Sequence, residues 1–182
     1  MPIQILDDFL PDDDFESIQK FFMTGHIPWK FTDKVTGTEK SEDAFQFTHM
    51  FFDAHPYYVL NFLSLADCKP IRSILGELDP YMLLRIKANL RTKTPEPIQS
   101  DFHTDLKTSN YTTSIYYLNS NNGYTLFEDG MKVPSVANRM ITFNGDMRHC
   151  GVSCTDQQTR VVLNINYLTT HGSNRTTSYN DE

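Results

Sequence analysis

Short β-type segments separated by turn residues fill the second half of this chain. From Tyr81 onward the sequence predicts strands at residues 82–86, 111–118, 124–127, 131–133, 139–144 and 159–168. Tight turns are indicated at Asn121-Asn122-Gly123, Glu128-Asp129-Gly130 and Asn144-Gly145, because such sequences readily adopt the positive φ angles of hairpins. Strands this short and this regularly spaced are typical of a sandwich or barrel, and a double-stranded β-helix (jelly roll) fits them.

The first 80 residues predict supporting elements around that β-rich half. The expected elements are a strand at Gln4–Leu6, a helix from Pro11 to near Gly25, one or two strands in residues 28–52 around a polar loop at 32–43, and helices at Pro56–Ala66 and Pro70–Leu78. We therefore expect a mainly β fold with supporting α-helices. It would form one domain over residues 1–182, with a catalytic core at 81–168 and a polar tail at 169–182.

Composition limits the class of protein. No apolar run approaches the roughly 20 residues of a membrane span, and the start Met1-Pro2-Ile3-Gln4 lacks the pattern of a secretory signal. The chain has three cysteines, Cys68, Cys150 and Cys154, and no CxxC motif. An odd number of cysteines without this motif favours free thiols in a reducing compartment, and hence a cytoplasmic location. The net charge of −7 disfavours nucleic acid, although a local basic groove would reverse that argument. No sequence signal indicates an oligomeric state.

The segment His103-Thr104-Asp105 is a candidate metal-binding pair. On an extended strand, residues two apart point to one face, so His103 and Asp105 can reach the same ion. His149 follows the Asn144-Gly145 turn, where a strand could return beside the first. Two histidines and one carboxylate form the donor set of a non-haem Fe(II) site with open positions. An HxD pair alone is common, and a surface histidine is its default interpretation.

Arg160 adds a second constraint. It begins the apolar run Arg160–Tyr167, and a buried guanidinium without a counter-charge is costly. The planar guanidinium suits a carboxylate, which it binds through two parallel hydrogen bonds. Taken alone, Arg160 is equally consistent with a carboxylate of the protein and with one of a ligand.

Together these residues resemble the 2-oxoglutarate- and Fe(II)-dependent oxygenases, and most closely their prolyl 4-hydroxylase branch. The resemblance covers about residues 81–168 and includes Thr113-Ser114-Ile115-Tyr116-Tyr117-Leu118-Asn119, Phe127-Glu128-Asp129-Gly130, Asn138-Arg139-Met140-Ile141-Thr142-Phe143 and His149-Cys150-Gly151-Val152. Residues 1–80 match only as supporting elements.

The resemblance implies a role for each site residue. His103, Asp105 and His149 would bind iron, and Arg160 would bind the distal carboxylate of 2-oxoglutarate. Tyr117 stands where the family has a tyrosine whose hydroxyl reaches that carboxylate, and Asn164 where it has a threonine at the cosubstrate. Tyr117 as a core tyrosine and Asn164 as a structural amide are the alternatives.

Two departures from the family pattern keep substrate contacts open. The turn reads Asn122-Gly123-Tyr124-Thr125 where the family often has Gly-Gly-x-Thr. The strand before HxD offers Leu84-Arg85-Ile86-Lys87 where the family has a tyrosine. The remaining histidines, His26, His49, His55 and His171, are expected to be structural or exposed.

The implied activity is hydroxylation of a substrate C–H bond with Fe(II), 2-oxoglutarate and O2, giving succinate and CO2, with ascorbate allowed as an auxiliary reductant. A peptidyl-proline or other protein side chain is the expected substrate, and a free amino acid or small metabolite is the alternative. The final strand lacks the second arginine expected of nucleic-acid demethylases. A cupin-like metal-binding module without keto-acid chemistry is the alternative of another class, and Arg160 and Tyr117 argue against it.

Overall fold

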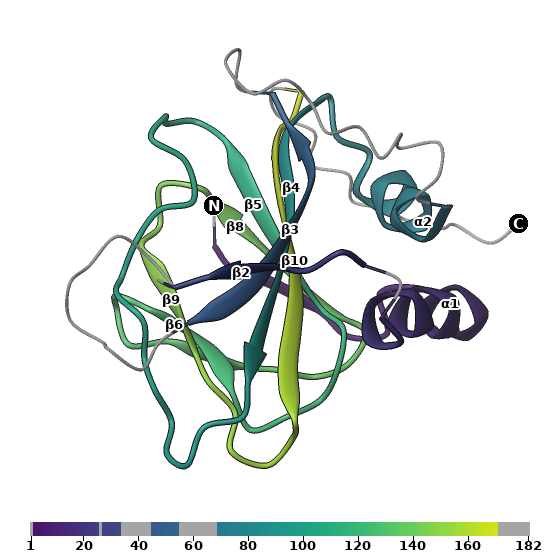
Figure 1. The fold of residues 1–182 in the computed structure, drawn as a ribbon. Coiled ribbons are helices and arrows are strands. Elements are labelled where there is room, and N and C mark those ends of the chain that lie inside the picture. The colour runs from purple at the N-terminus through teal and green to yellow at the C-terminus, as the bar shows by residue number, and fades with distance from the viewer. Residues whose placement is uncertain (1, 26, 34–44, 55–68, 171–182) are drawn as a thin grey trace, which may run out of the picture.

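Two antiparallel sheets form the body of the molecule (Figure 1). The computed structural model describes residues 2–25, 27–33, 45–54 and 69–170. The large sheet has seven strands in the order β1-β8-β5-β10-β4-β3-β2, and the small sheet has three in the order β7-β6-β9. The strands are β1 Gln4–Leu6, β2 Lys30–Thr32, β3 Gln46–Asp53, β4 Met82–Thr92, β5 Thr112–Tyr117, β6 Tyr124–Phe127, β7 Lys132–Pro134, β8 Arg139–Asn144, β9 His149–Val152 and β10 Thr159–Leu168. The predicted jelly-roll fold with supporting helices is confirmed.

Two helices, α1 (Asp12–Met23) and α2 (Lys69–Leu78), lie on one side of the large sheet, and β6 and β9 lie on the other (Figure 1). Pro11 precedes α1 and three aspartates occupy its first turn, where negative charge is favoured by the helix dipole. Ile18 and Phe22 are buried against the sheet, as their spacing predicted. No helix in the described part of the chain is long and apolar enough to cross a membrane.

Several sequence predictions lie outside the described residues. They are the helix at Pro56–Ala66, most of the loop at 32–43, the tail beyond residue 170, and the predictions for His26, His55, His171 and Cys68. Residues 28–52 form two strands, β2 and β3, in their described part.

β4 is the main correction to the predicted strands. The sequence predicted a strand only at 82–86 and a loop from residue 91, whereas β4 spans eleven residues to Thr92. Its second half alternates polar and apolar residues, because one side faces the helices and the other faces the space between the sheets. That alternation lowers the mean hydropathy of the second half of β4, so a search for hydrophobic runs does not detect it as a strand.

β4 and β10 pair along their whole length and lie at the centre of the large sheet. Their outer face packs on the helices and consists of Ile86, Ala88 and Leu90 from β4 and Val161, Leu163 and Ile165 from β10. Their inner face looks toward the small sheet and consists of Arg85, Lys87, Asn89 and Arg91 from β4 and Arg160, Val162, Asn164 and Asn166 from β10. Apolar side chains fill one part of the space between the sheets, and these polar side chains line the rest.

Candidate metal centre and cosubstrate pocket

His103, Asp105 and His149 meet at one point between the two sheets. One potential ligand atom from each lies within 4.8 Å of the others. His103 and His149 are held side by side by two backbone hydrogen bonds of 3.0 Å, each N–H donating to the other residue's carbonyl. The predicted strand for the HxD pair is wrong: His103 forms a single bridge and Asp105 lies in the loop that follows. The bridge to β9, rather than strand alternation, brings the ligands together.

Both imidazoles use Nδ1 in a hydrogen bond to a backbone carbonyl, which leaves Nε2 for a metal ion. Nδ1 of His103 donates to the Asp101 carbonyl at 2.9 Å, and Nδ1 of His149 donates to the Met147 carbonyl at 3.1 Å. Because a carbonyl only accepts, each Nδ1 carries a proton, and the neutral form of such a ring has its lone pair on Nε2, as a metal-binding histidine requires. Nε2 of His149 is buried without a hydrogen-bond partner among the described residues. Burial also lowers the pKa of His149 and so favours the neutral ring.

Asp105 is fixed by three side chains of the inner face. Arg85 makes an ion pair of 2.7 Å with Oδ1 and donates to the Asp105 backbone carbonyl at 2.9 Å. Asn166 donates to Oδ2 at 3.0 Å and Asn164 approaches Oδ1 at 3.5 Å. Burial by itself would raise the pKa of Asp105, but the charge of Arg85, the two imidazoles and the Asn166 hydrogen bond outweigh it and lower that pKa below its ordinary value.

Two imidazoles whose Nδ1 atoms donate to backbone carbonyls and one carboxylate therefore meet at this point, and the buried Nε2 of His149 has no hydrogen-bond partner among the described residues. This set fits a divalent transition metal, because such ions take nitrogen and carboxylate ligands that carry no protons. The residues around it are already oriented by hydrogen bonds, as a metal-binding site requires.

Arg160 lies at the other end of the same cavity. It is 4% exposed, and its guanidinium donates to Ser135 at 2.9 Å and to Thr125 at 3.2 Å. No carboxylate of the described residues forms an ion pair with it. The glycine at 123 is explained by this side chain, because a Cβ there would lie 2.8 Å from Arg160 Cδ and 2.8 Å from the Val152 carbonyl.

Tyr117 reaches Arg160 through Thr125. Its hydroxyl donates to Thr125 Oγ1 at 2.7 Å, and its ring lies 5.6 Å from the Arg160 guanidinium carbon. Tyr117 is fully buried and does not line the cavity. Its predicted direct contact with a bound carboxylate stays a prediction. Asn164 does line the cavity, and its Oδ1 has no partner among the described residues, so its predicted cosubstrate role also stays a prediction.

Arg91 is a site residue that the sequence argument missed. It is 5% exposed and donates to the Gly151 carbonyl at 2.9 Å. Arg91 and Arg160 are partners across β4 and β10, and a Cβ at Gly151 would lie 3.9 Å and 3.5 Å from their respective Nη1 atoms. Burial, and next the charge of Arg160, lowers the pKa of Arg91 to about 10. Two guanidinium groups thus converge at one end of the cavity, and no carboxylate of the described part of the chain accompanies them there.

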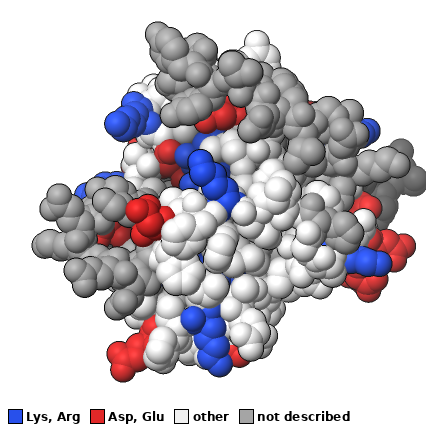
Figure 2. Space-filling model, in the orientation of Figure 1, with Lys and Arg blue, Asp and Glu red and all other residues white. Residues whose placement is uncertain are grey.

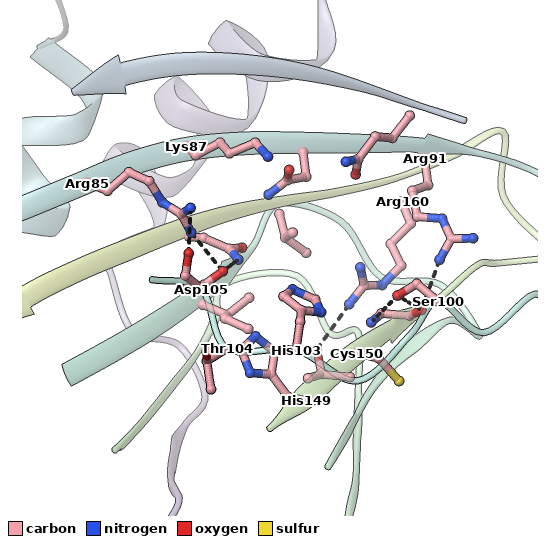
Figure 3. A pocket seen from close by; sticks show the side chains of 17 residues that line it. Arg85, Lys87, Arg91, Ser100, His103, Thr104, Asp105, His149, Cys150 and Arg160 are labelled. Atoms are coloured by element: carbon pink, nitrogen blue, oxygen red, sulfur yellow. Dashed lines mark hydrogen bonds and ion pairs between the residues drawn. The ribbon is translucent and has the colours of Figure 1, made fainter. Parts of the chain in front are cut away.

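The cavity has a volume of about 290 Å³. His103, Asp105 and His149 lie toward one end and Arg160 and Arg91 toward the other (Figure 3). Lys87 and Asn89 from β4, and Ile115, Val162 and Cys150, line the space between and around them. Burial raises the pKa of the Cys150 thiol to about 11, so this cysteine is a neutral part of the wall.

Several solved structures have a fold similar to that of this chain. A prolyl hydroxylase from Trichoplax adhaerens, solved with a peptide fragment of the hypoxia inducible factor oxygen degradation domain, matches with a TM-score of 0.61 at 12% identity over 91% of this chain and 83% of its own. A 2OG-Fe(II) oxygenase family oxidoreductase from Burkholderia pseudomallei has a TM-score of 0.60 at 14% identity, over 95% and 88% of the two chains.

The epimerase SnoN of nogalamycin biosynthesis, solved with Fe3+, alpha ketoglutarate and nogalamycin RO, has a TM-score of 0.61 at 10% identity over 91% and 78%. No sequence-family model and no curated protein matches the chain. At these identities the likeness establishes the fold, and it confirms the predicted resemblance to these oxygenases, a prolyl hydroxylase among them, at that level.

Proposed function

We propose that this chain is a 2-oxoglutarate- and Fe(II)-dependent dioxygenase that hydroxylates a substrate C–H bond. One observation carries the proposal: a single cavity has a two-histidine, one-carboxylate cluster at one end and a buried guanidinium without a carboxylate partner in the described chain at the other. The first suits a metal ion with open coordination positions. The second suits the distal carboxylate of a dicarboxylic acid.

His103, Asp105 and His149 would hold the metal. When bound, Fe(II), 2-oxoglutarate and O2 supply the oxidation, in which the keto acid becomes succinate and CO2 and one oxygen atom enters the substrate. The role of Arg85 and Asn166 is to keep the Asp105 carboxylate ionised and in one orientation. The backbone carbonyls of Asp101 and Met147 keep both imidazoles in the tautomer that binds metal.

Arg160 would bind the distal carboxylate together with Thr125. Thr125 accepts hydrogen bonds from both Arg160 and Tyr117, and a hydroxyl has two acceptor lone pairs and one proton. Its own proton is therefore left to donate to a ligand in the cavity that it lines. Tyr117 acts in this scheme as a positioning residue, and Arg91 adds a second positive charge at the same end.

The substrate proposed first is a peptidyl-proline or another protein side chain, because of the resemblance to the prolyl hydroxylase branch. A free amino acid or small metabolite is the second candidate, which the small cavity volume of about 290 Å³ favours. A nucleic-acid substrate is not proposed. On the face drawn in Figure 2, the Lys and Arg residues of the described chain lie dispersed among acidic and neutral ones rather than in a broad basic surface.

The test is formation of succinate from 2-oxoglutarate by the Fe(II)-loaded protein. Many enzymes of this chemistry turn over slowly without substrate, so we expect succinate above a metal-free control, and more when a peptide or metabolite substrate is present. Asp105→Ala removes a ligand and should abolish turnover. The matched control Asp101→Asn alters an exposed carboxylate two residues before His103 and should retain it. Absence of succinate, both with candidate substrates and without, contradicts the proposal.

A further inference from the structure

We infer that Lys87 is an anchor for a carboxylate of the substrate, and hence that the substrate is an acid. The inference deepens the proposed function and rests on it. The carboxylate belongs either to a free acidic metabolite or amino acid, or to an Asp or Glu side chain of a peptide.

The first observation is the row of side chains on β4. Arg85, Lys87, Asn89 and Arg91 occupy alternate positions, and all four line the cavity. Three of them are cations. In Figure 3, Lys87 lies on the same strand as Arg85 and Arg91 and between them, across the cavity from His103 and His149. A cationic row of this kind, facing the interior, is unfavourable unless each charge has a counterpart.

The second observation separates Lys87 from its neighbours. Arg85 pairs with Asp105 at 2.7 Å, and Arg91 donates to the Gly151 carbonyl at 2.9 Å. Lys87 makes no hydrogen bond and no ion pair with any residue that the structure describes. The residue opposite Lys87 on β10 is Asn164, a neutral side chain whose amide is directed at Asp105. Burial, and next the charge of Arg85, lowers the pKa of Lys87; the charge of Asp105, which pairs with Arg85, acts in the opposite direction but does not cancel that shift.

The third observation is the balance of charge around the cavity. Among the described residues, its lining contains four cations, Arg85, Lys87, Arg91 and Arg160, and one carboxylate, Asp105. A divalent metal adds positive charge, and 2-oxoglutarate brings two negative charges. One of its carboxylates is needed at the metal and the other at Arg160 and Arg91. The cavity therefore remains positively charged after the cosubstrate has bound, and Lys87 is the cation that is left for the substrate.

The competing explanation is that Lys87 neutralises the carboxylate of 2-oxoglutarate that binds the metal. The two explanations differ in which affinity depends on Lys87. An anchor for the substrate alters substrate preference and leaves the KM for 2-oxoglutarate near its wild-type value, whereas a partner of the cosubstrate raises that KM.

The experiment uses the full chain with Fe(II) and saturating 2-oxoglutarate, and measures succinate above the substrate-free rate. The probes are matched pairs: aspartate and glutamate against asparagine and glutamine, and octapeptide pools with a central Asp or Glu against the same pools with Asn or Gln. We expect the acidic members of at least one class to stimulate turnover about tenfold or more over their amides, the effect of one charge-assisted hydrogen bond. The free amino acids and the pools distinguish the two sources of the carboxylate.

Three variants complete the test. Lys87→Met should abolish the preference for the acid, and Lys87→Arg should retain most of it. Lys93→Met changes an exposed lysine at the end of the same segment and is the matched control. The KM for 2-oxoglutarate in each variant also reports that the site is folded.

The inference is overturned if acids and amides stimulate equally, if neither set stimulates, or if Lys87→Met raises the KM for 2-oxoglutarate while the preference persists. In each of these cases substrate-free succinate formation by the wild-type protein would leave the proposed function intact. Absence of any succinate would overturn both.

Discussion

The outer and inner faces of β4 and β10 are built on the same backbone but have opposite chemistry. On the outer face, Ile86, Ala88, Leu163 and Ile165 are fully buried among apolar side chains beneath the two helices. On the inner face, a residue away along each strand, stand the cations and amides of the cavity. One pair of strands therefore contributes both to the hydrophobic core and to the candidate site. Successive side chains of a strand point to opposite faces, and this keeps the apolar and the polar residues apart.

Burial of side chains contributes favourably to stability on the outer face, whereas burial of charges on the inner face costs free energy. Each fully buried Leu or Ile of the outer face contributes roughly 1.5–3 kcal/mol to stability. Arg160 and Arg91 are nearly as well buried, but no carboxylate of the described chain pairs with them, and burying such charges costs free energy. Ligand carboxylates would stabilise these two guanidinium groups, and the apolar packing of the outer face offsets the cost of burying them.

The largest expected effect is loss of the metal at the inner face. Asp105→Ala removes one of three ligands and should weaken Fe(II) or Mn(II) binding by more than the roughly 100-fold that loss of a supporting hydrogen bond produces. Anaerobic calorimetry measures it. Asp101→Asn, with an exposed side chain, should bind as the wild type does. Equal metal affinity in the two variants would remove Asp105 from the site.

The second prediction concerns stability without ligands. Leu163→Ala on the outer face should lower the free energy of unfolding by about 2–5 kcal/mol, because it opens a cavity in the core. Arg160→Met, three residues before it on the inner face, should leave stability unchanged or raise it, because a buried charge is replaced by an apolar chain of similar length. Urea denaturation of the metal-free proteins measures both. A loss in Arg160→Met as large as that in Leu163→Ala would contradict the contrast between the faces.

The third prediction separates two amides of the inner face. Asn166 donates to Asp105 at 3.0 Å and to Thr113 at 3.0 Å, whereas Asn164 is 3.5 Å from Asp105. Asn166→Ala should reduce metal affinity by about 10–100-fold, and Asn164→Ala should reduce it less while lowering the affinity for 2-oxoglutarate. Metal titration followed by 2-oxoglutarate titration measures both effects. If the two variants exchange these effects, the assignments are wrong.

The smallest expected effects are those of replacing two glycines by alanine, Gly123 beside Arg160 and Gly76 in α2. A Cβ at Gly123 meets Arg160 and the Val152 carbonyl, both at 2.8 Å, so Gly123→Ala should cost about 1–3 kcal/mol and weaken 2-oxoglutarate binding. Gly76→Ala, in α2 with open space around it, should stabilise by roughly 0.5–1 kcal/mol. Thermal unfolding compares them. A neutral Gly123→Ala would show that Arg160 does not need this close approach.

The sequence predicted those site residues that belong to a local motif or match the pattern of the family. His103, Asp105 and His149 meet as expected, although a single bridge to β9, not a strand, aligns them. Arg160 was expected to be buried because its strand is apolar, and it is.

The inner face of β4 was not predicted because strands were assigned from runs of hydrophobic residues. Lys87, Asn89 and Arg91 interrupt the run, yet their alternation with Ala88 and Leu90 has the period of a half-buried strand. The contacts of Asn166 with Asp105 and of Ser135 with Arg160 depend on strand register and on loops distant in sequence. No local pattern predicts them.

The central claim is that a keto acid spans the cavity from the metal to Arg160. The most direct test is calorimetric binding of 2-oxoglutarate and of 2-oxopentanoate, which has the same chain length without the distal carboxylate, to the metal-loaded protein without oxygen. The wild type should prefer 2-oxoglutarate by roughly 10–100-fold, the value of a charge-assisted hydrogen-bonded pair, and Arg160→Met should lose that preference. Equal binding of the two acids by the wild type, or an unchanged preference in Arg160→Met, would contradict the account.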